Sequence, residues 1–329
     1  MKRVILDTDP GVDDALAIIL AILSPDLAVQ AITTVGGNTN VAQCTQNVRK
    51  ILEILRPEVP PIVARGEAGS LVAAAEVHGR DGLGDLDRFT DSDGITKRYP
   101  EPSLYPVSSR HVADVILSLA AEYPHKIALI PTGPLTNIAR AIIQNPEGMR
   151  KFKEIIIMGG AFSVPGNITA VAEFNIYADP HSADVVVNSG LPITFVGLDV
   201  THRVWLGKSR LEEEIKPLNT RLSRFICDIS GIYMDFHKEH YGIPGCHIHD
   251  LLAVSVAIDP SLVETEEAYV QVETKGKITS GMTVADLRPT KLRDGRSNVR
   301  ICIDVDTDRF LTLFLSAVKN WQDIIPFLS

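Results

Sequence analysis

The sequence lacks several features that would place it in large classes of proteins. Its longest apolar run, Ala15 to Leu23, is about half of what a bilayer-spanning helix requires. The four cysteines are scattered without a CxxC pair, which indicates reduced thiols in a reducing cytosol. Neither of the phosphate-binding motifs GxGxxG and GxxxxGKS/T is present, which disfavours a nucleotide-phosphate site. We therefore expect a soluble, cytoplasmic protein.

Basic character is also missing. The formal net charge is −9 and no basic stripe occurs, so we expect neither a nucleic-acid partner nor a membrane partner. Lys2-Arg3 and the apolar residues 4–6 faintly resemble a signal peptide. Asp7 ends that apolar run well short of the roughly 7 to 15 residues of a signal h-region, so export is not expected.

What the chain does have is a dense acidic segment near its N-terminus. A short apolar strand at residues 4–6 runs into a turn, and an apolar helix follows over residues 15–23. Capping of that helix explains two acids but not four. Their mutual repulsion favours a bound cation, and Ca²⁺ accepts about six to eight carboxylate and carbonyl oxygens. The four acids are Asp7, Asp9, Asp13 and Asp14.

Short β-rich runs alternate with amphipathic helical segments through the first two thirds of the chain. This alternation predicts an α/β protein with a Rossmann-like, open, mostly parallel sheet and helices on both faces. Polar loops follow the predicted strands, at the edge where such sheets bind ligands. The expected strands are 27–35, 61–64, 127–130, 155–158 and 193–196, and the expected helices are 41–55, 112–121, 135–144 and 181–188.

Two regions interrupt the alternation. Residues 66–107 are rich in Gly, Asp, Arg and Pro and too long for an ordinary connection, which predicts a lid or a disordered loop. Residues 202–248 are predicted to form a mostly helical insertion near the active site. No repeat or linker divides the chain, so we expect residues 1–329 to form a single domain.

A second candidate site is the pair His249-Asp250, which precedes an apolar helix at residues 251–258. Burial would disfavour Asp250 unless it were paired, metal-bound or used as an N-cap. A histidine beside a carboxylate at the mouth of a buried helix is suited to acid catalysis near neutral pH. A zinc site of Cys246, His247 and His249 lacks a second ligand pair at the usual spacing and is disfavoured.

A polar segment follows the strand predicted at residues 155–158. If residues 173–175 are extended, Glu173 and Asn175 share one face and Phe174 takes the other. Together with Asn167, two polar side chains on one face suit sugar hydroxyls, although plain solvation of a loop is the alternative.

Taken in order, these motifs resemble those of the inosine-uridine preferring nucleoside hydrolases. The resemblance runs from residue 3 to about residue 260 and is highly specific. It implies hydrolysis of the N-glycosidic bond of ribonucleosides to ribose and free base, a tightly held Ca²⁺, and a homodimer or homotetramer. The matching segments are residues 7–15, 36–38, 78–79, 131–137, 158–161, 165–167, 173–180 and 249–250.

The resemblance also implies a role for individual residues. Asp9 would be the general base toward a calcium-bound water, and His249 would protonate the leaving base. His78 would lie in a mobile loop that closes over the site. The base-contacting residues, between about 225 and 245, vary within the family. The implied calcium ligands are the carboxylates of Asp9, Asp14 and Asp250 and the backbone carbonyl of Thr132. The implied substrate-binding residues are Asp13, Asn38, His78, Met158, Asn167, Glu173, Phe174 and Asn175.

The chemistry of these residue types agrees with that role. Cleavage of an N-glycosidic bond leaves an oxocarbenium-like ribosyl cation, which carboxylates around a divalent ion stabilise. A metal also lowers the pKa of a bound water and makes it a nucleophile.

Two other functions stay open. Asp7-Thr8-Asp9 superficially matches the DxD of Mg²⁺-dependent aspartyl phosphatases, with Asp7 as the nucleophile. No clear later lysine and Asp-Asp pair supports that reading. A non-catalytic ribose- or nucleoside-binding protein is disfavoured by the missing export signal and by the presence of both Asp9 and His249.

Overall fold

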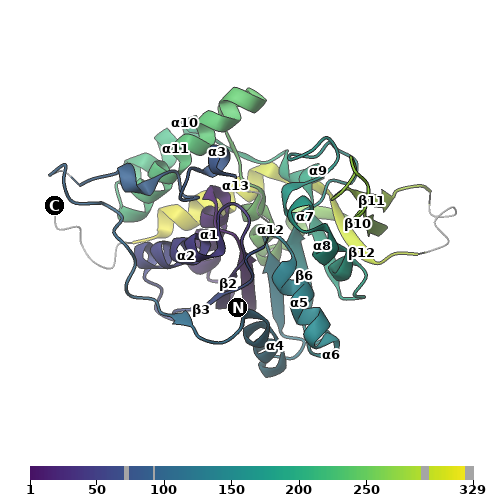
Figure 1. The fold of residues 1–329 in the computed structure, drawn as a ribbon. Coiled ribbons are helices and arrows are strands. Elements are labelled where there is room, and N and C mark those ends of the chain that lie inside the picture. The colour runs from purple at the N-terminus through teal and green to yellow at the C-terminus, as the bar shows by residue number, and fades with distance from the viewer. Residues whose placement is uncertain (70–73, 92, 290–295, 323–329) are drawn as a thin grey trace.

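The computed structural model describes residues 1–69, 74–91, 93–289 and 296–322 (Figure 1). Its centre is a ten-stranded sheet in the order β11-β10-β12-β7-β6-β5-β1-β2-β3-β4. All neighbouring pairs from β12 to β4 are parallel, whereas β10 runs antiparallel to both β11 and β12. The strands are β1 (Lys2–Thr8), β2 (Leu27–Thr34), β3 (Ile62–Arg65), β4 (Val107–Ser108), β5 (Ile127–Pro131), β6 (Glu154–Met158), β7 (Ile193–Val196), β10 (Val263–Val272), β11 (Thr283–Asp286) and β12 (Val299–Val305).

Helices cover both faces of this sheet, which confirms the predicted fold class. Successive side chains of β1 point to opposite faces, so Val4 and Leu6 join one core and Ile5 joins the other. The first core contains α1 (Val12–Leu23), α2 (Val41–Leu55), α11 (Arg221–Tyr241), α12 (His249–Ile258) and α13 (Thr307–Asn320). The second contains α4 (Val112–Glu122), α5 (Thr136–Gln144), α6 (Pro146–Met149) and α8 (Pro180–Val187).

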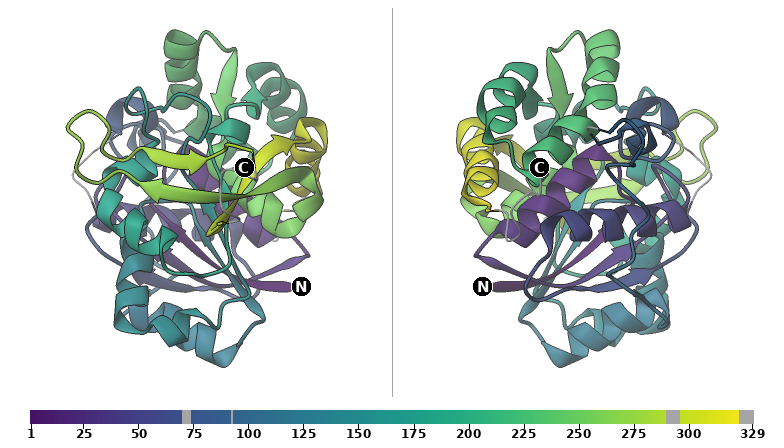
Figure 2. Two further views of the ribbon diagram at one scale, coloured as in Figure 1. Left: turned by 90° about the vertical axis from the view of Figure 1, so that its right-hand side faces the viewer. Right: turned by 90° about the vertical axis from the view of Figure 1, so that its left-hand side faces the viewer.

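The strands and helices predicted from the first two thirds of the chain are all present, with ends that differ by a few residues. The C-terminal elements β10, β11, β12 and α13 had no counterpart in the prediction. In the left view of Figure 2 these yellow-green strands face the viewer. No helix among the described residues has the length and apolar character that crossing a membrane requires.

Residues 202–248 are mostly helical, as predicted, and begin and end with a small sheet. This sheet pairs β8 (Trp205–Gly207) with β9 (Gly245–His247) antiparallel, so the two ends of the insertion are tied together. The sequence analysis did not predict these two short strands. Between them lie α10 (Lys208–Arg210) and two short helical turns, Leu211–Ile215 and Lys216–Leu218.

The segment 66–107 is irregular but packed, as far as the structure describes it. It contains α3 (Ala75–His78) and buries Leu83 and Leu86 in the core. Arg98 and Tyr99 each donate a hydrogen bond to Asp228 of α11 at 2.8 Å. Of the two alternatives for 66–107, the disordered loop does not describe these packed residues, and the lid stays a prediction. Residues 70–73 and 92 lie outside the described residues.

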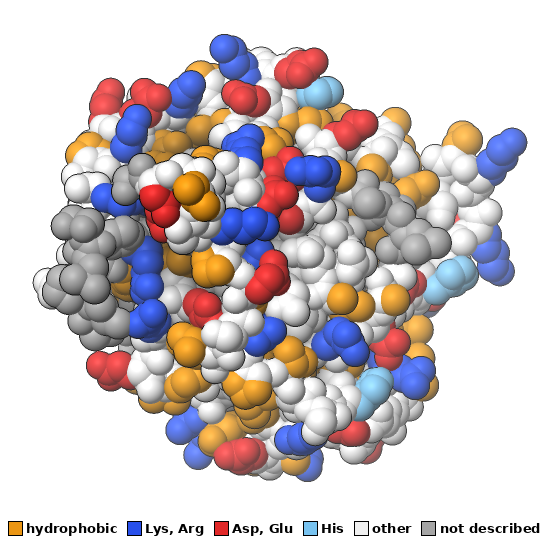
Figure 3. Space-filling model, turned by 60° about the vertical axis from the view of Figure 1, so that its left-hand side comes forward, with side chains coloured by type: hydrophobic (Ala, Val, Ile, Leu, Met, Phe, Trp, Pro, Cys, Tyr) orange, Lys and Arg blue, Asp and Glu red, His pale blue; other side chains and the backbone are white. Residues whose placement is uncertain are grey.

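Charges of both signs alternate on the molecular face drawn in Figure 3. Lysine and arginine side chains lie among aspartate and glutamate side chains there, and the described residues form no continuous basic band across this face. This distribution agrees with the absence of a basic stripe in the sequence.

Candidate active site

The acidic segment forms the junction between β1 and α1. Asp14 lies in the first turn of α1, where Thr8 donates a side-chain hydrogen bond to its Oδ1. The backbone N–H of Gly11 donates to Oδ2 at 3.0 Å, which satisfies one of the free N–H groups of the helix start. The carboxylate of Asp14 is therefore fixed by its own turn.

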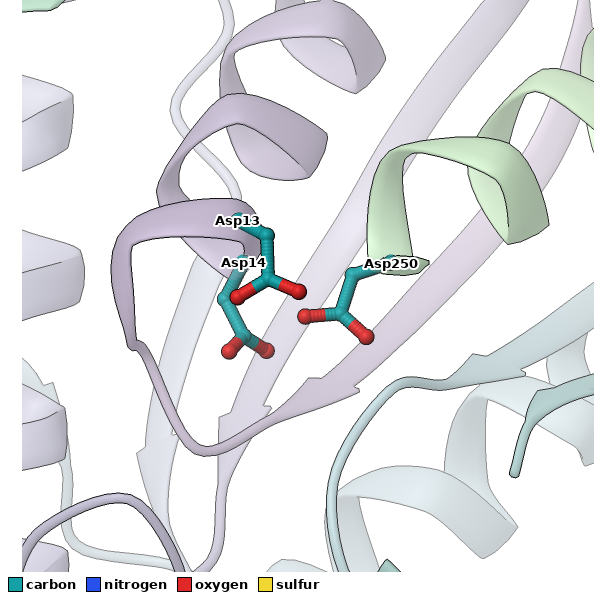
Figure 4. A group of neighbouring side chains, drawn as sticks. All are labelled: Asp13, Asp14 and Asp250. Atoms are coloured by element: carbon teal, nitrogen blue, oxygen red, sulfur yellow. The ribbon is translucent and has the colours of Figure 1, made fainter. Parts of the chain in front are cut away.

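Helix α12 packs beside α1 and brings a third carboxylate to this junction. Oxygen atoms of Asp13, Asp14 and Asp250 lie within 4.8 Å of one another, and all three residues are buried. Figure 4 shows the side chains of the first turns of α1 and α12 pointing toward a common centre. Asp250 lies inside the first turn of α12, since the N-cap is Ile248, so the N-cap alternative for Asp250 is wrong.

Asp9 is not a member of this trio. It is 1% exposed and accepts a hydrogen bond on Oδ2 from the backbone N–H of Asn38 at 2.8 Å. Glycines flank its carboxylate: a Cβ on Gly37 would lie 2.0 Å from Oδ2, and one on Gly133 2.5 Å from Oδ1. The structure therefore places Asp9 in a tight backbone cradle beside the trio.

The carboxyl groups strongly affect one another. Burial raises the pKa of Asp250 well above its ordinary value, and the charges of Asp13, Asp14 and Asp9 raise it further. Burial and the charge of Asp14 raise the pKa of Asp13 to about 7. The pKa of Asp9 is raised well above its ordinary value, first by burial and then by the charge of Asp14. Close, buried carboxylates of this kind require protons or a cation.

Thr132, at the end of β5, connects the trio to the sugar-binding candidates. Its hydroxyl donates to Oδ1 of Asp14 at 2.9 Å, and its carbonyl accepts a hydrogen bond from Nδ2 of Asn175 at 2.8 Å. Carboxylate and carbonyl oxygens are the donors that hard divalent cations prefer. The residues present therefore fit such an ion.

A cavity of about 500 Å³ opens beside the acidic trio at the carboxyl edge of the sheet. This volume lies within the usual range of small-molecule sites. Asp9 and Asp14 are not part of its lining. The cavity does bring together eleven of the predicted site residues: Asp13, Asn38, His78, Thr132, Met158, Asn167, Glu173, Phe174, Asn175, His249 and Asp250.

The predicted extended conformation of residues 173–175 is wrong. Glu173 is the N-cap of the short helix α7 (Phe174–Ala178) and accepts from the backbone N–H groups of Asn175 at 2.9 Å and Ile176 at 3.2 Å. These hydrogen bonds favour a helical turn over a strand. Burial raises the pKa of Glu173 to about 7.

His249 opens α12 and faces the cavity. Its Nδ1 is hydrogen-bonded to Oγ1 of Thr201 at 2.8 Å. Burial lowers the pKa of His249 well below its ordinary value, and the charges of His247 and His202 add to this effect. Among the described residues, Asp13, Asp14 and Asp250 are the only three His, Cys, Asp or Glu side chains close enough together to hold a metal ion. Cys246, His247 and His249 therefore do not converge as the ligands of a zinc site would.

Helix α11 forms one wall of the cavity, within the range of about 225–245 where the resemblance implies base-contacting residues but names none. His237 is 3% exposed and lines the cavity, although no HExxH motif surrounds it in the sequence. Tyr233, His237 and Tyr241 recur every fourth residue and so share one face of α11. That spacing of aromatic and imidazole rings was the available signal. The lining residues from α11 are Tyr233, Phe236, His237 and Tyr241.

An acidic, oxygen-rich centre beside a cavity, at the carboxyl edge of a parallel sheet, defines an α/β protein with a small-ligand site. Residues 4–312 match the family described as inosine-uridine preferring nucleoside hydrolase. The chain belongs to this family of hydrolases.

This chain matches individual relatives over nearly its whole length. It is 36% identical over 326 residues to the inosine-uridine preferring nucleoside hydrolase of Crithidia fasciculata, spanning 98% of this chain and 99% of that one. The pyrimidine-specific ribonucleoside hydrolase RihA of Salmonella gallinarum is 36% identical, over 97% and 98% of the two chains. The purine-preferring ribonucleoside hydrolase structure from Gardnerella vaginalis superposes with a TM-score of 0.86 at 33% identity, over 97% and 98%. These relatives are named for different bases.

Proposed function

We propose that this protein hydrolyses the N-glycosidic bond of ribonucleosides, of purine or pyrimidine type, to ribose and free base with the help of Ca²⁺. The observation that carries the proposal is the buried trio of Asp13, Asp14 and Asp250 beside a cavity that His249 also lines. Acidic groups and a histidine then meet at one small-molecule site.

The proposed calcium ligands are the carboxylates of Asp9, Asp14 and Asp250 and the carbonyl of Thr132. Their support is the all-oxygen donor set and the burial of the carboxylates, whose negative charges raise one another's pKa. Asp13 is close enough to this set to add charge. When bound, a divalent ion holds oxygen ligands in place and lowers the pKa of water.

Different side chains of the protein then have different roles in the reaction. Asp9, held by the N–H of Asn38, accepts the proton of the attacking water. The surrounding carboxylates stabilise positive charge on the ribosyl group as the C–N bond breaks. The ribose hydroxyls are bound by Asp13, Asn38, Asn167, Glu173 and Asn175, with Met158 and Phe174 as apolar walls.

The leaving base takes the electron pair of the broken bond and needs a proton. His249 lines the cavity from the start of α12 and is the proposed donor. His78 lines it from α3 and stacks on Tyr233 with ring centroids 4.8 Å apart. We assign His78 to covering the bound nucleoside.

The same resemblance supports wider proposals. Residues 1–329 form a single nucleoside hydrolase domain in which 66–107 and 202–248 border the site, since side chains of α3 and α11 line the cavity. The partner is a small ribonucleoside rather than a nucleic acid or a membrane. We place the protein in the cytoplasm as a homodimer or homotetramer, a location with which its free cysteines agree.

Incubation with inosine and with uridine tests the proposal, with released reducing sugar and free base measured before and after treatment with a calcium chelator. We expect release of both products and its loss after chelation. Binding without release would favour a nucleoside-binding protein, and hydrolysis of nitrophenyl phosphate would favour the phosphatase. Asp7, the nucleophile in that alternative, is fully buried and accepts a hydrogen bond from Asn137 at 2.8 Å, outside the cavity lining.

A further inference from the structure

A hydroxyl group lies behind the histidine of the site. Thr201 ends the short helix α9 (Leu198–Thr201), which follows β7, and is completely buried. Its Oγ1 is 2.8 Å from Nδ1 of His249, although 48 residues separate the two along the chain. The other ring nitrogen of His249, Nε2, has no hydrogen-bond partner among the described residues, and the ring lines the cavity.

The proton of this hydroxyl has one available acceptor. Helical threonines often donate to the carbonyl four residues earlier, as Thr45 does to Val41 at 2.7 Å. Thr201 makes no such bond, and within the described chain its Oγ1 is hydrogen-bonded only to His249. A buried hydroxyl proton without an acceptor is unfavourable, so the hydroxyl donates to Nδ1.

That direction of donation determines the tautomer of the ring. A neutral imidazole carries one N–H, and a nitrogen that accepts a hydrogen bond has none. With Nδ1 of His249 as acceptor, its proton is on Nε2, the nitrogen left free toward the cavity. The neighbouring rings differ: Nδ1 of His237 lies 2.8 Å from the carbonyl of Tyr233, and Nδ1 of His247 lies 3.3 Å from that of Val204. Carbonyls only accept, so these rings carry their proton on Nδ1.

We propose that Thr201 is a positioning residue, whose hydroxyl holds the neutral ring of His249 in the Nε2–H tautomer. Nε2–H then donates a hydrogen bond that stabilises the negative charge on the departing nucleobase before the base is protonated. This inference rests on the proposed function, in which His249 serves the leaving group. The inference predicts that a substitution of Thr201 slows only substrates whose leaving group needs an N–H donor. Such a substitution leaves the carboxylates and the ribose-binding residues unchanged.

Kinetics of the full-length protein test the proposal with three variants. Thr201→Val replaces the hydroxyl by a methyl of similar size, and Thr201→Ser retains the hydroxyl. Thr194→Val makes the same change at a buried threonine of β7 that does not line the cavity. Each variant is assayed with inosine and with nitrophenyl riboside, whose phenolate departs without a proton.

We expect Thr201→Val to lower kcat for inosine roughly ten- to hundredfold, with KM little changed, which is less than the roughly 10²- to 10⁴-fold that complete loss of a positioned acid costs. Nitrophenyl riboside hydrolysis should change less than about threefold, a small effect beside the contribution of a positioned acid. Thr201→Ser should restore most of the inosine rate, and Thr194→Val should leave both rates near wild type. Equal losses on the two substrates, or no loss on inosine, would overturn the proposal.

A measurement without turnover separates this inference from the proposed activity. In protein labelled with ¹⁵N-histidine, nitrogen shifts distinguish N–H from acceptor nitrogens, and the His249→Gln variant identifies the His249 signals. We expect a protonated Nε2 and an acceptor Nδ1, with a mixture of tautomers in Thr201→Val. A protonated Nδ1 in the wild-type protein would overturn the proposal even if nucleosides are hydrolysed. The expected tautomer in a protein that releases no ribose would instead count against the proposed function alone.

Discussion

The backbone N–H of Asn38 donates a hydrogen bond to Oδ2 of Asp9 at 2.8 Å, so the loop after β2 fixes the carboxylate at the end of β1. We expect Asp9→Asn to lower kcat about 10²- to 10⁴-fold with a much smaller change in KM. An amide still offers one oxygen but cannot accept the proton of water. Steady-state kinetics with inosine measure this, and a near-normal kcat would place the base elsewhere.

The glycine beside Asp9 is predicted to be essential. A Cβ at Gly37 would lie 2.0 Å from Oδ2 of Asp9, so Gly37→Ala must displace that carboxylate and should lower activity at least about tenfold, as small misplacements of catalytic groups do. Gly231→Ala in α11 is the matched control, since its Cβ would approach nothing closer than Nη2 of Arg88 at 3.5 Å. Helix propensity predicts about 0.5–1 kcal/mol of added stability for the control. Full activity of Gly37→Ala would contradict the inference that the backbone at Gly37 holds the Asp9 carboxylate in its catalytic position.

Ca²⁺ is expected to copurify with the protein and to be lost from Asp14→Ala. Removal of this carboxylate deletes up to two oxygen ligands and part of the charge that holds the ion. Elemental analysis after dialysis gives the metal content. Asp87→Ala removes an acidic side chain that is 59% exposed and should retain calcium. Stoichiometric calcium in Asp14→Ala would refute the ligand assignment.

Leaving-group dependence tests His249. We expect His249→Ala to slow inosine hydrolysis roughly 10²- to 10⁴-fold while sparing nitrophenyl riboside, because only the nucleobase needs a proton. The two rates should be compared in one preparation of the variant. If both rates fall equally, His249 supports structure or metal binding, and another group such as His78, His240 or Tyr241 donates the proton.

The stability of the metal-free protein should depend on pH through His78. Burial lowers the pKa of this histidine from 6.5 to about 3, and the charge of His237 contributes to the decrease. Its neutral form is thus favoured by folding: the stabilisation is complete above the unfolded pKa of 6.5 and is lost as pH falls toward 3. Between about pH 7 and about pH 5, this loss amounts to about 2 kcal/mol.

Urea unfolding at the two pH values checks this prediction. In His78→Asn the unfolding free energy should fall by about 2 kcal/mol less than in the wild type, since the asparagine does not titrate. In the wild type, the backbone N–H of Val12 donates a hydrogen bond to Nδ1 of His78 at 3.1 Å. The side-chain oxygen of an asparagine at this position can accept the same hydrogen bond. The exposed His125 provides the control, and His125→Asn should follow the wild-type curve. Parallel curves for all three proteins would show that His78 is not the titrating group.

Much of the site could be predicted because its motifs are local. The strand, turn and helix at residues 2–23 place Asp9, Asp13 and Asp14 within one junction, whatever the rest of the chain does. The alternation of strands and helices likewise predicted the parallel sheet, since both periodicities are local properties. The conformation of residues 173–175 was missed because capping by Glu173 outweighs the apparent β pattern.

By itself, the sequence determined the fold class, the acidic junction and the resemblance that points to nucleoside hydrolysis, because each depends on residues close together in the chain. Only the tertiary structure decided that Asp13, rather than Asp9, forms the close trio with Asp14 and Asp250, that His237 lines the cavity, and that Thr201 bonds His249. Those relationships depend on how α12 packs against α1 and how α9 lies beside α12. Such packing is set by side-chain shape and burial across the whole core, which no local pattern encodes.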